Sequence, residues 1–446
     1  MAEPLERQAD SLNLPRKTEA FKGDLCFVLL ALALVSLRLA LLLDATPLWL
    51  MAVAAVLTVV VWRNPQEAAP AAILFLFCAS VILPVAVIDV PAQTPTEMYY
   101  WAGGLFLITG AAVARLGSRV FRIPNSAKGF FAVSMLAAVY GLAQGISVGY
   151  VARQLYGILL LIAYLALAIH LGTEKLLVRR IQTYGFLCAL LFFVYYIVAF
   201  AQYGIEKQAN PAGPEAALLS TVLLTSAVVN RNFLRAVVAL ILLVIPALLL
   251  SRSALLTPFV ATILTIAICA KSKTAKVFSY LVAAGLGLIG TLPPVANIAG
   301  DIIRLIFGSN SIVPEEIFHA DSLLGRAMQM VSALATARVH PLLGAGLGSN
   351  IEWFEPASGW MSAAFVDNGW AYLLAKMGVA GLVTFLWFLA TVFRHVARQT
   401  AALSACLLTV TLVTMFSQAS YFHFTQAPLM GTIAGLLLAK DYRRTA

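Results

Sequence analysis

Residues 25–43 read LCFVLLALALVSLRLALLL, a run in which Arg38 is the single charged residue. A helix needs roughly 20 mostly apolar residues to cross a bilayer core about 30 Å thick, and residues 277–299 form a second run of this kind. A membrane β-barrel would instead show alternating segments of about ten residues. The run therefore predicts a transmembrane helix, and similar runs recur along the chain.

The composition of the whole chain agrees with this prediction. Of its 446 residues, 61% are hydrophobic and 11% are charged, whereas charged residues make up about 25% of a typical soluble domain. We expect an all-α fold, a polytopic transmembrane helical bundle of about 14 spans, with about 12 as the lower limit. The predicted spans are residues 25–43, 47–62, 69–88, 98–114, 129–147, 154–171, 181–202, 215–229, 234–250, 254–270, 277–299, 369–393, 401–418 and 423–439.

The distribution of charge predicts the orientation of these spans. If the N-terminal tail (1–24) is cytoplasmic, the loops on its side carry most of the Lys and Arg residues, and the opposite loops carry acids such as Asp44, Asp89 and Glu97. This is the positive-inside pattern. The net charge of +10 therefore reports orientation and requires no nucleic-acid partner. We expect the C-terminal tail (440–446) to be cytoplasmic as well.

Two other features bear on the class of protein. A signal peptide has a short apolar core and a small-residue cleavage site, whereas the first span here is long and follows a polar stretch, so we expect it to be retained. All five cysteines lie in apolar runs, and no Cys/His spacing of the zinc-binding kind is present. We expect neither a disulfide framework nor a metal site.

One predicted connection is long. Helices at 25–299 and 369–439 flank a loop at 300–368 that falls on the outer, periplasmic side, and long ordered loops are usually functional. Within it, residues 322–338 have the pattern of an amphipathic helix with Ser322 as the N-cap. We expect this helix to lie along the membrane surface or to pack on the bundle.

Basic residues on the outer side are scarce and therefore informative. Arg252 lies in the turn Ser251-Arg252-Ser253 between two apolar runs, and Arg153 begins the sixth predicted span. Each side chain is explained either as a snorkelling end-cap or ion pair, or as a functional group at membrane depth. Since a guanidinium offers a planar fork of donors, the two arginines together would suit a phosphate or diphosphate.

A second group of residues lies in the long loop. Arg326 and Arg338 flank the predicted helix, and His340 opens the stretch HPLLGAGLG at 340–348. The alternating glycines allow tight turns and a close approach to a ligand, but no strand precedes them as in a dinucleotide-binding motif. His340 is either a solvated or helix-capping residue or a catalytic one.

A third group closes the loop. Asp367 is either an N-cap of the next span or a general base, a role that partial burial of a carboxylate favours. Asn368 follows it. The nearby aromatic residues, Trp360 and Trp370 among them, are either an interfacial belt or a stacking platform for sugar rings.

The order of these motifs resembles that of the O-antigen ligase and O-antigen polymerase superfamily of bacterial membrane glycosyltransferases. The resemblance lies in the turn at Arg252, in Gly325-Arg326 with the stretch 340–346, and in Asp367-Asn368 with Gly378 and Gly381 downstream. It covers roughly the C-terminal half of the chain, and Arg153 is a looser match. Ligases of the superfamily typically have His-Asn where this chain has Asp367-Asn368, which favours a polymerase or another exopolysaccharide-type transferase.

The resemblance implies a GT-C-like architecture in the bacterial inner membrane and an active site on the periplasmic face. It implies inverting, metal-independent and cofactor-free transfer of a glycan from undecaprenyl diphosphate. Arginines would hold the diphosphate, and on this sequence we expect Arg153, Arg252, Arg326 and Arg338 in that role, with Asp367 or His340 as the catalytic base. From their position we expect Asn368, Trp360 and Trp370 to contact the glycan or the loop. The expected partners are the bilayer, a lipid-linked oligosaccharide donor, a glycan acceptor and other polysaccharide assembly proteins.

Transport or lipid flipping is the main alternative. A secondary transporter often has internal repeats and broken helices, with polar groups near the bilayer midplane. Most predicted spans here lack acids or bases at mid-depth, although Pro84 and Pro246 are expected to kink two of them. The two functions differ in one respect: a transferase predicts that the outer polar residues converge, and a transporter predicts a polar path through the membrane.

Overall fold

The computed structural model describes residues 46–82, 96–203, 212–248, 252–270, 273–274, 277, 320–355, 359–363, 366, 368–394, 401–417 and 421–444. Residues 1–49 and 50–446 form two compact units, and the first is described only at 46–49, the start of α3. The predicted spans at 25–43 and 277–299 lie outside the described residues. The outline below concerns the second unit.

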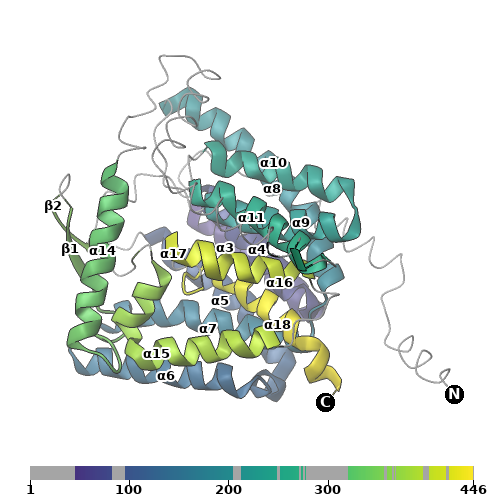
Figure 1. Ribbon diagram of the computed structural model, residues 1–446. Coiled ribbons are helices and arrows are strands. Elements are labelled where there is room, and N and C mark those ends of the chain that lie inside the picture. The colour runs from purple at the N-terminus through teal and green to yellow at the C-terminus, as the bar shows by residue number, and fades with distance from the viewer. Residues whose placement is uncertain are drawn as a thin grey trace. The chain divides into compact units, whose positions relative to one another are not determined.

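The described chain is almost entirely helical (Figure 1). Its elements are α3 (Thr46–Arg63), η1 (Pro65–Glu67), α4 (Ala68–Ile82), α5 (Thr96–Leu116), η3 (Gly117–Phe121), α6 (Asn125–Ala143), α7 (Val148–His170), α8 (Glu174–Tyr203), α9 (Ala212–Asn230), α10 (Phe233–Leu248), α11 (Arg252–Cys269), α14 (Ala320–Val339), β1 (Ile351–Glu355), β2 (Gly359–Ala363), α15 (Gly369–Arg394), α16 (Ala401–Thr409), the π-helix η6 (Val410–Thr414), α17 (Met415–Ser417) and α18 (Ala427–Arg444).

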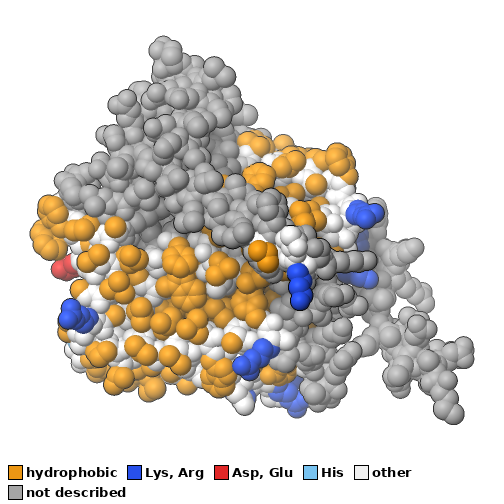
Figure 2. All heavy atoms as spheres, viewed as in Figure 1, with side chains coloured by type: hydrophobic (Ala, Val, Ile, Leu, Met, Phe, Trp, Pro, Cys, Tyr) orange, Lys and Arg blue, Asp and Glu red, His pale blue; other side chains and the backbone are white. Residues whose placement is uncertain are grey.

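Length and composition make this a multi-pass membrane protein. Within the described ranges, four helices are long and apolar enough to cross a bilayer, at Tyr100–Phe121, Asn125–Ala143, Val148–His170 and Gly369–Arg394, and shorter apolar helices accompany them. Apolar side chains cover most of the described surface that Figure 2 shows, as a lipid-facing surface requires. The predicted helical membrane fold is confirmed, whereas the count of about 14 spans and the GT-C-like arrangement remain predictions.

At two places near the candidate site a helix begins away from the start of the predicted span. α7 begins at Val148 rather than at 154, so Arg153 lies inside the helix. α18 begins at Ala427 rather than at 423, and residues 421–426 form a buried turn in which the His423 carbonyl accepts from the N–H groups of Gln426 and Ala427. Hydropathy caused both errors, because it measures how apolar a segment is and not its backbone conformation.

Helices α7 and α18 pack closely along their length, and glycine explains it. A Cβ atom on Gly431 would lie 2.3 Å from the carbonyl oxygen of Leu161, and one on Gly435 would lie 2.4 Å from that of Leu165. Small residues four positions apart let two membrane helices approach to backbone contact, where close packing replaces the missing hydrophobic driving force. The start of α7, with Arg153, is thereby fixed against the segment that carries the turn 421–426.

Basic residues gather at one end of the bundle. Arg115, at the end of α5, lies over the ring of Trp62 at the end of α3, with 5.6 Å from its guanidinium carbon to the ring centroid. At the same level Arg180 of α8 forms a buried ion pair with Glu67 of η1 at 2.5 Å. In Figure 2 the Lys and Arg side chains lie mostly toward the right, the side on which α18 ends. This asymmetry is what the positive-inside rule expects of a cytoplasmic end.

The opposite end carries α14 and a small hairpin. α14 runs across the left-hand ends of α6 and α15 in Figure 1 and packs on α15 and β1. It begins two residues before the predicted helix of 322–338, so Ser322 lies in its first turn rather than at its cap. β1 and β2 pair antiparallel in a hairpin that the sequence analysis did not predict. Less exposed and more exposed residues alternate along IEWFE and GWMSA. The residues PAS between these two segments, which include a proline, are the sequence feature that could have predicted the hairpin.

Candidate active site

The stretch HPLLGAGLG is a turn inserted into a break in α15. Gly378 interrupts this helix with φ 62° and ψ −161°. At the break the N–H groups of Val379 and Ala380 donate to the carbonyls of Pro341 and Leu342, at 2.8 and 3.1 Å. The N–H of Ala345 donates to the carbonyl of Ala375 at 2.8 Å. The turn therefore satisfies the backbone groups that the broken helix leaves open, which is the condition for irregular backbone at membrane depth.

The alternating glycines of this turn are explained by close contact with helices. Gly344, Gly346 and Gly348 all have positive φ values, of 65°, 85° and 88°. A Cβ on Gly344 would lie 2.5 Å from the carbonyl oxygen of Ala375, and one on Gly346 would lie 2.6 Å from the Cα of Gly141 in α6. The glycines approach the protein's own backbone, not a ligand, so the ligand-approach interpretation is not needed to explain them.

A buried polar cluster holds the turn in place. Gln154 of α7 is fully buried, and its carboxamide oxygen accepts from the Gly348 N–H at 2.8 Å and from the Tyr372 hydroxyl at 3.4 Å. Its amide nitrogen lies 3.5 Å from the Ser349 carbonyl oxygen, to which the ammonium of Lys376 also donates. Lys376 lies 3.3 Å from the Ser349 hydroxyl as well. Three elements thus meet at one hydrogen-bonded point.

Lys376 is the most unusual member of this cluster. Its side chain is completely buried, about 10 Å along α15 from Gly369 by helical rise. Among the described residues no carboxylate pairs with it, and its hydrogen bonds are those to Ser349. A buried ammonium without a counter-ion is costly, and an ionisable group inside a membrane helix is by default a functional candidate.

Arg153 lies beside His423, a residue of the turn 421–426. The guanidinium of Arg153 and the buried surroundings of His423 act in the same direction, and burial is the larger effect: together they lower the pKa of the imidazole to about 4. The imidazole Nδ1 is 2.7 Å from the Thr425 hydroxyl, and its ring stacks on Phe424 at 5.0 Å. Both Arg153 and His423 are partly exposed. The pair is a cation and a neutral hydrogen-bonding group next to the Gln154 cluster.

The structure does not describe three of the predicted site residues fully. Arg252 is the first residue of α11, and Arg326 lies in α14, but the side chains of both lie outside the described part of the chain. Asp367 lies outside it entirely. Their convergence with Arg153 stays a prediction.

His340 and Arg338 lie at the end of α14. The N–H of His340 donates to the Thr336 carbonyl at 3.0 Å, and the His340 carbonyl accepts from the N–H of Gly344, also at 3.0 Å. The imidazole meets the ring of Tyr140 edge-on at 6.5 Å. Arg338, in the last turn of α14, is exposed. These contacts of His340 with other described residues support the alternative in which it ends the helix. Arg153 is not among the described residues that His340 contacts.

Asn368 and the two tryptophans have separate roles. Asn368 caps α15, since its side-chain oxygen accepts from the N–H groups of Trp370 and Ala371 at 3.0 and 2.9 Å. Trp370 packs its ring against Phe385 and Phe416. Trp360, on β2, is 76% exposed. The helix cap that was weighed for Asp367 is thus supplied by its neighbour, and of the two tryptophans Trp360 is the one open to a ligand.

Sequence reasoning missed Gln154, Lys376 and His423 as site residues. A Gln and a Lys within long apolar helices are a signal that a search for polar residues inside predicted spans would have found. His423 was assigned to a helix, which concealed that a turn presents it. In the described part of the chain, no three His, Cys, Asp or Glu side chains come together as a metal site would require.

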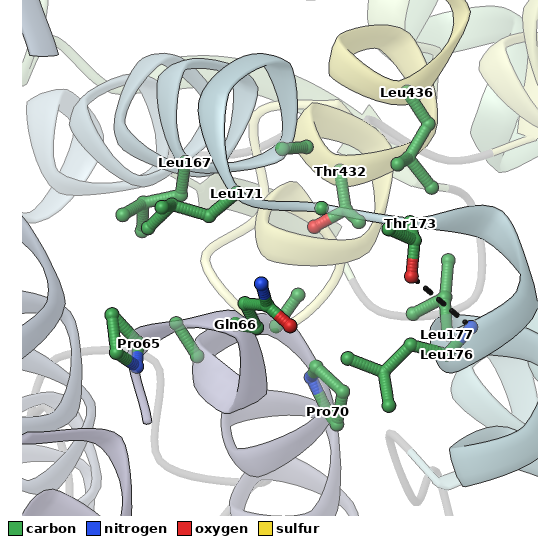
Figure 3. Close-up of a pocket in the computed structure, with 14 residues that line it drawn as sticks. Pro65, Gln66, Pro70, Leu167, Leu171, Thr173, Leu176, Leu177, Thr432 and Leu436 are labelled. Carbon is green, nitrogen blue, oxygen red and sulfur yellow. Dashed lines mark hydrogen bonds between the residues drawn. The ribbon is translucent and has the colours of Figure 1, made fainter. Parts of the chain in front are cut away.

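A small cavity lies at the other end, near the basic residues. Apolar residues line most of it, among them Pro65, Pro70, Leu167, Leu171 and Leu436 (Figure 3). The hydrogen bond drawn there is a helix cap, in which the N–H of Leu176 donates to the hydroxyl oxygen of Thr173 at 3.4 Å. Its apolar walls do not suit an anionic substrate, so the polar cluster around Gln154 and Lys376 is the better candidate for the active site.

Comparison with known proteins bears on this end of the molecule. Residues 237–386 match the model of a family described as O-antigen ligase, and no curated protein matches the sequence. The matched stretch contains α11, α14, the turn 340–349 and most of α15, which are the elements that carry the three predicted motifs. α7 and the turn 421–426 lie outside it. The match at residues 237–386 confirms the predicted resemblance to the O-antigen ligase and polymerase superfamily.

Proposed function

We propose that the protein transfers an oligosaccharide from undecaprenyl diphosphate on the periplasmic face of the bacterial inner membrane, and that it is a polymerase of O-antigen or exopolysaccharide rather than a ligase. One observation carries the proposal: Arg153 of α7 lies beside His423, and the next residue, Gln154, is joined to Lys376 of α15 through Ser349. The family match at 237–386 supports the reaction class.

The chemistry follows from the groups present. The hydroxyl oxygen of an acceptor sugar attacks the anomeric carbon of the donor, the bond from that carbon to the diphosphate oxygen breaks, and undecaprenyl diphosphate leaves. A guanidinium is suited to the charge that develops on the diphosphate, because it donates two parallel hydrogen bonds. Arg153 takes this role, with Arg252, Arg326 and Arg338 as the further diphosphate ligands.

The base that takes the proton of the acceptor hydroxyl is Asp367 or His340. Between them, the resemblance favours Asp367, because it occupies the position of the ligase histidine. The contacts of His340 with Tyr140 and with the end of α14 also favour Asp367. His423 is a poor base, since a pKa of about 4 is far from neutrality. Ligases of the superfamily have a histidine where this chain has Asp367, and this difference is the reason for preferring a polymerase.

Transport remains a second candidate because α15 is broken, as helices of secondary transporters often are. In such transporters the open backbone groups at the break bind the substrate or ion. Here they bind the turn 340–349. This difference favours the transferase.

The test is incubation of purified protein with a lipid-linked repeat unit alone. Chain growth is expected from a polymerase, whereas a ligase needs a second acceptor, and a transporter yields no new glycosidic bond with either. Arg252→Ala is expected to abolish polymer and to leave membrane insertion intact; near-normal polymer would remove Arg252 from the diphosphate site. Asp367→Asn is also expected to be inactive, and full turnover by that variant would exclude Asp367 as the base.

A further inference from the structure

The β1–β2 hairpin has two unlike faces. The register places Phe354 opposite Trp360 and Glu352 opposite Ser362, and these four side chains share one face because successive residues of a strand alternate. The other face, with Ile351 and Trp353, is buried. Trp360 is 76% exposed and Phe354 44% exposed. The four residues Glu352, Phe354, Trp360 and Ser362, here named the hairpin face, therefore lie open to the surroundings.

The chemistry of the hairpin face suits a sugar. The rings of Phe354 and Trp360 meet edge-on at 5.9 Å, an arrangement that leaves aromatic surface uncovered. The C–H groups on one side of a pyranose ring are apolar and weakly positive, so they stack on the negative face of an aromatic ring. The carboxylate of Glu352 accepts hydrogen bonds from sugar hydroxyls, and the hydroxyl of Ser362 donates and accepts them. The two pairs lie about 7 Å apart along the strands, the scale of a single sugar ring.

The chemistry of the hairpin face argues against lipid as the occupant. In Figure 1 the hairpin lies beside α14, on the side away from α15, and hydrophobic side chains gather in this region at the left edge of Figure 2 with an acidic side chain beside them. On α14 the exposed Val331 and the buried Ala333 lie on nearly opposite sides of the helix, about 160° apart. The side with Val331 is therefore an exposed apolar surface, and it can contact the membrane without the hairpin face. A carboxylate on the hairpin face would oppose insertion into lipid.

The hairpin is joined to the candidate active site at both ends. β1 begins at Ile351, two residues after Ser349, and β2 ends at Ala363, five residues before the α15 cap Asn368. The hydroxyl of Ser332 on α14 also donates to the Glu352 carbonyl. A glycan bound on the hairpin face is therefore held at a fixed position relative to the polar cluster of Gln154 and Lys376.

We propose that the hairpin face binds one pyranose unit of the acceptor or growing glycan, at a site distinct from the residues that hold the diphosphate. The proposal rests on glycan transfer as the proposed function. It assigns Trp360 and Phe354 to stacking and Glu352 and Ser362 to hydroxyl recognition. Since the site holds the glycan and not the reacting atoms, it governs how long the acceptor stays and so the length of the product.

The binding test needs no turnover. The probe is the free oligosaccharide that mild acid releases from the host's polyprenyl-diphosphate glycans, and its binding to the full chain in nanodiscs is measured by saturation-transfer NMR. We expect wild type to bind it, Trp360→Ala and Phe354→Ala to bind at least tenfold more weakly, and Glu352→Gln to bind more weakly. Val339→Ala, which removes an apolar side chain that is 73% exposed on α14, is the matched control and should bind as wild type does.

Three results would overturn the proposal. The first is wild-type affinity in Trp360→Ala, and the second is no binding of the oligosaccharide by wild type. The third is that brominated lipids quench the fluorescence of Trp360, identified as the part of the signal that Trp360→Phe removes, which would mean that lipid covers the hairpin face. Product length gives a separate readout: Trp360→Ala should still form glycosidic bonds but yield shorter polymer. If wild type forms no glycosidic bond with any lipid-linked donor, the proposed function fails, while the binding result still decides the hairpin face.

Discussion

The carboxamide oxygen of Gln154 accepts a hydrogen bond of 2.8 Å from the backbone N–H of Gly348, which lies 194 residues further along the chain. This bond joins α7, which carries Arg153, to the turn that fills the break in α15. The turn is held in addition by Lys376 through Ser349. The geometry of the candidate site thus depends on buried polar contacts between the part of the chain matched by the family and a helix outside it.

Gln154→Leu should destabilise the protein, because it leaves the buried Gly348 N–H without its acceptor. The free energy of unfolding should fall by about 1–3 kcal/mol. Thermal unfolding can be followed with a thiol-reactive dye in a Cys269→Ser background, since Cys269 is exposed whereas Cys188 and Cys406 are buried in the native state. Gln144→Leu, at an exposed position just after α6, is the control and should unfold like wild type. Equal midpoints for the two variants would show that the Gln154 bond contributes nothing.

Lys376→Met should separate stability from activity. The substitution removes the unfavourable desolvation of a buried ammonium but also its hydrogen bonds to Ser349, so the two effects should offset and the unfolding midpoint should change little. The transfer rate should fall at least tenfold, because an ionisable side chain buried inside a membrane helix is costly and is usually kept for a functional reason. Rates and midpoints are to be measured on the same preparation. Wild-type turnover by Lys376→Met would leave the lysine with a packing role alone.

Arg153→Ala should lower transfer at least a hundredfold, mainly through weaker binding of the lipid-linked donor. Arg153→Lys should restore only part of it, since an ammonium lacks the planar fork that binds two phosphate oxygens. Arg119→Ala, which removes an exposed arginine at the other end of the bundle, serves as the control. The measurement is the donor dependence of the initial rate. If Arg119→Ala and Arg153→Ala behave alike, the loss reflects charge in general and not a diphosphate site.

His423 should make stability depend on pH. Its pKa is lowered from 6.5 to about 4 by burial and by Arg153, so the unfolded chain binds a proton more readily than the native protein between these values. The free energy of unfolding should therefore be greatest above pH 6.5 and fall as the pH decreases toward 4. Unfolding midpoints measured from pH 4 to pH 8 test this. In His423→Gln the part of the slope due to His423 should disappear; an unchanged slope would assign it to other groups.

Gly378→Ala should disrupt the break in α15. The φ of 62° is unfavourable for alanine, and the added Cβ would lie 2.3 Å from the carbonyl oxygen of Leu342, which is backbone and has little freedom to move. Together these effects should cost about 2 kcal/mol or more. Gly103→Ala, in α5, adds a Cβ with no atom within 4 Å and should be neutral or stabilising. Comparable folding yields and midpoints for both variants would contradict the described turn.

Apolar length and the placement of Lys and Arg determined much of this protein from the sequence alone. They gave a helical membrane protein, most helix positions within a few residues, and one basic end, because these properties are local to each segment and depend on the lipid solvent. The order of the motifs at Arg252, at 340–348 and at Asp367 also gave the superfamily, which the match at 237–386 confirms. The roles of those residues stay predictions.

Only the tertiary structure decided what the polar residues contact. The sequence could not show that the glycines at 344, 346 and 348 fit against α15, α6 and α7, or that Gln154 and Lys376 meet at Ser349. Nor could it show that 421–426 is a turn that brings His423 to Arg153. The reason is physical: hydropathy ranks each residue by its own transfer into lipid, whereas a buried hydrogen bond depends on a partner that may lie hundreds of residues away and is supplied only by the fold.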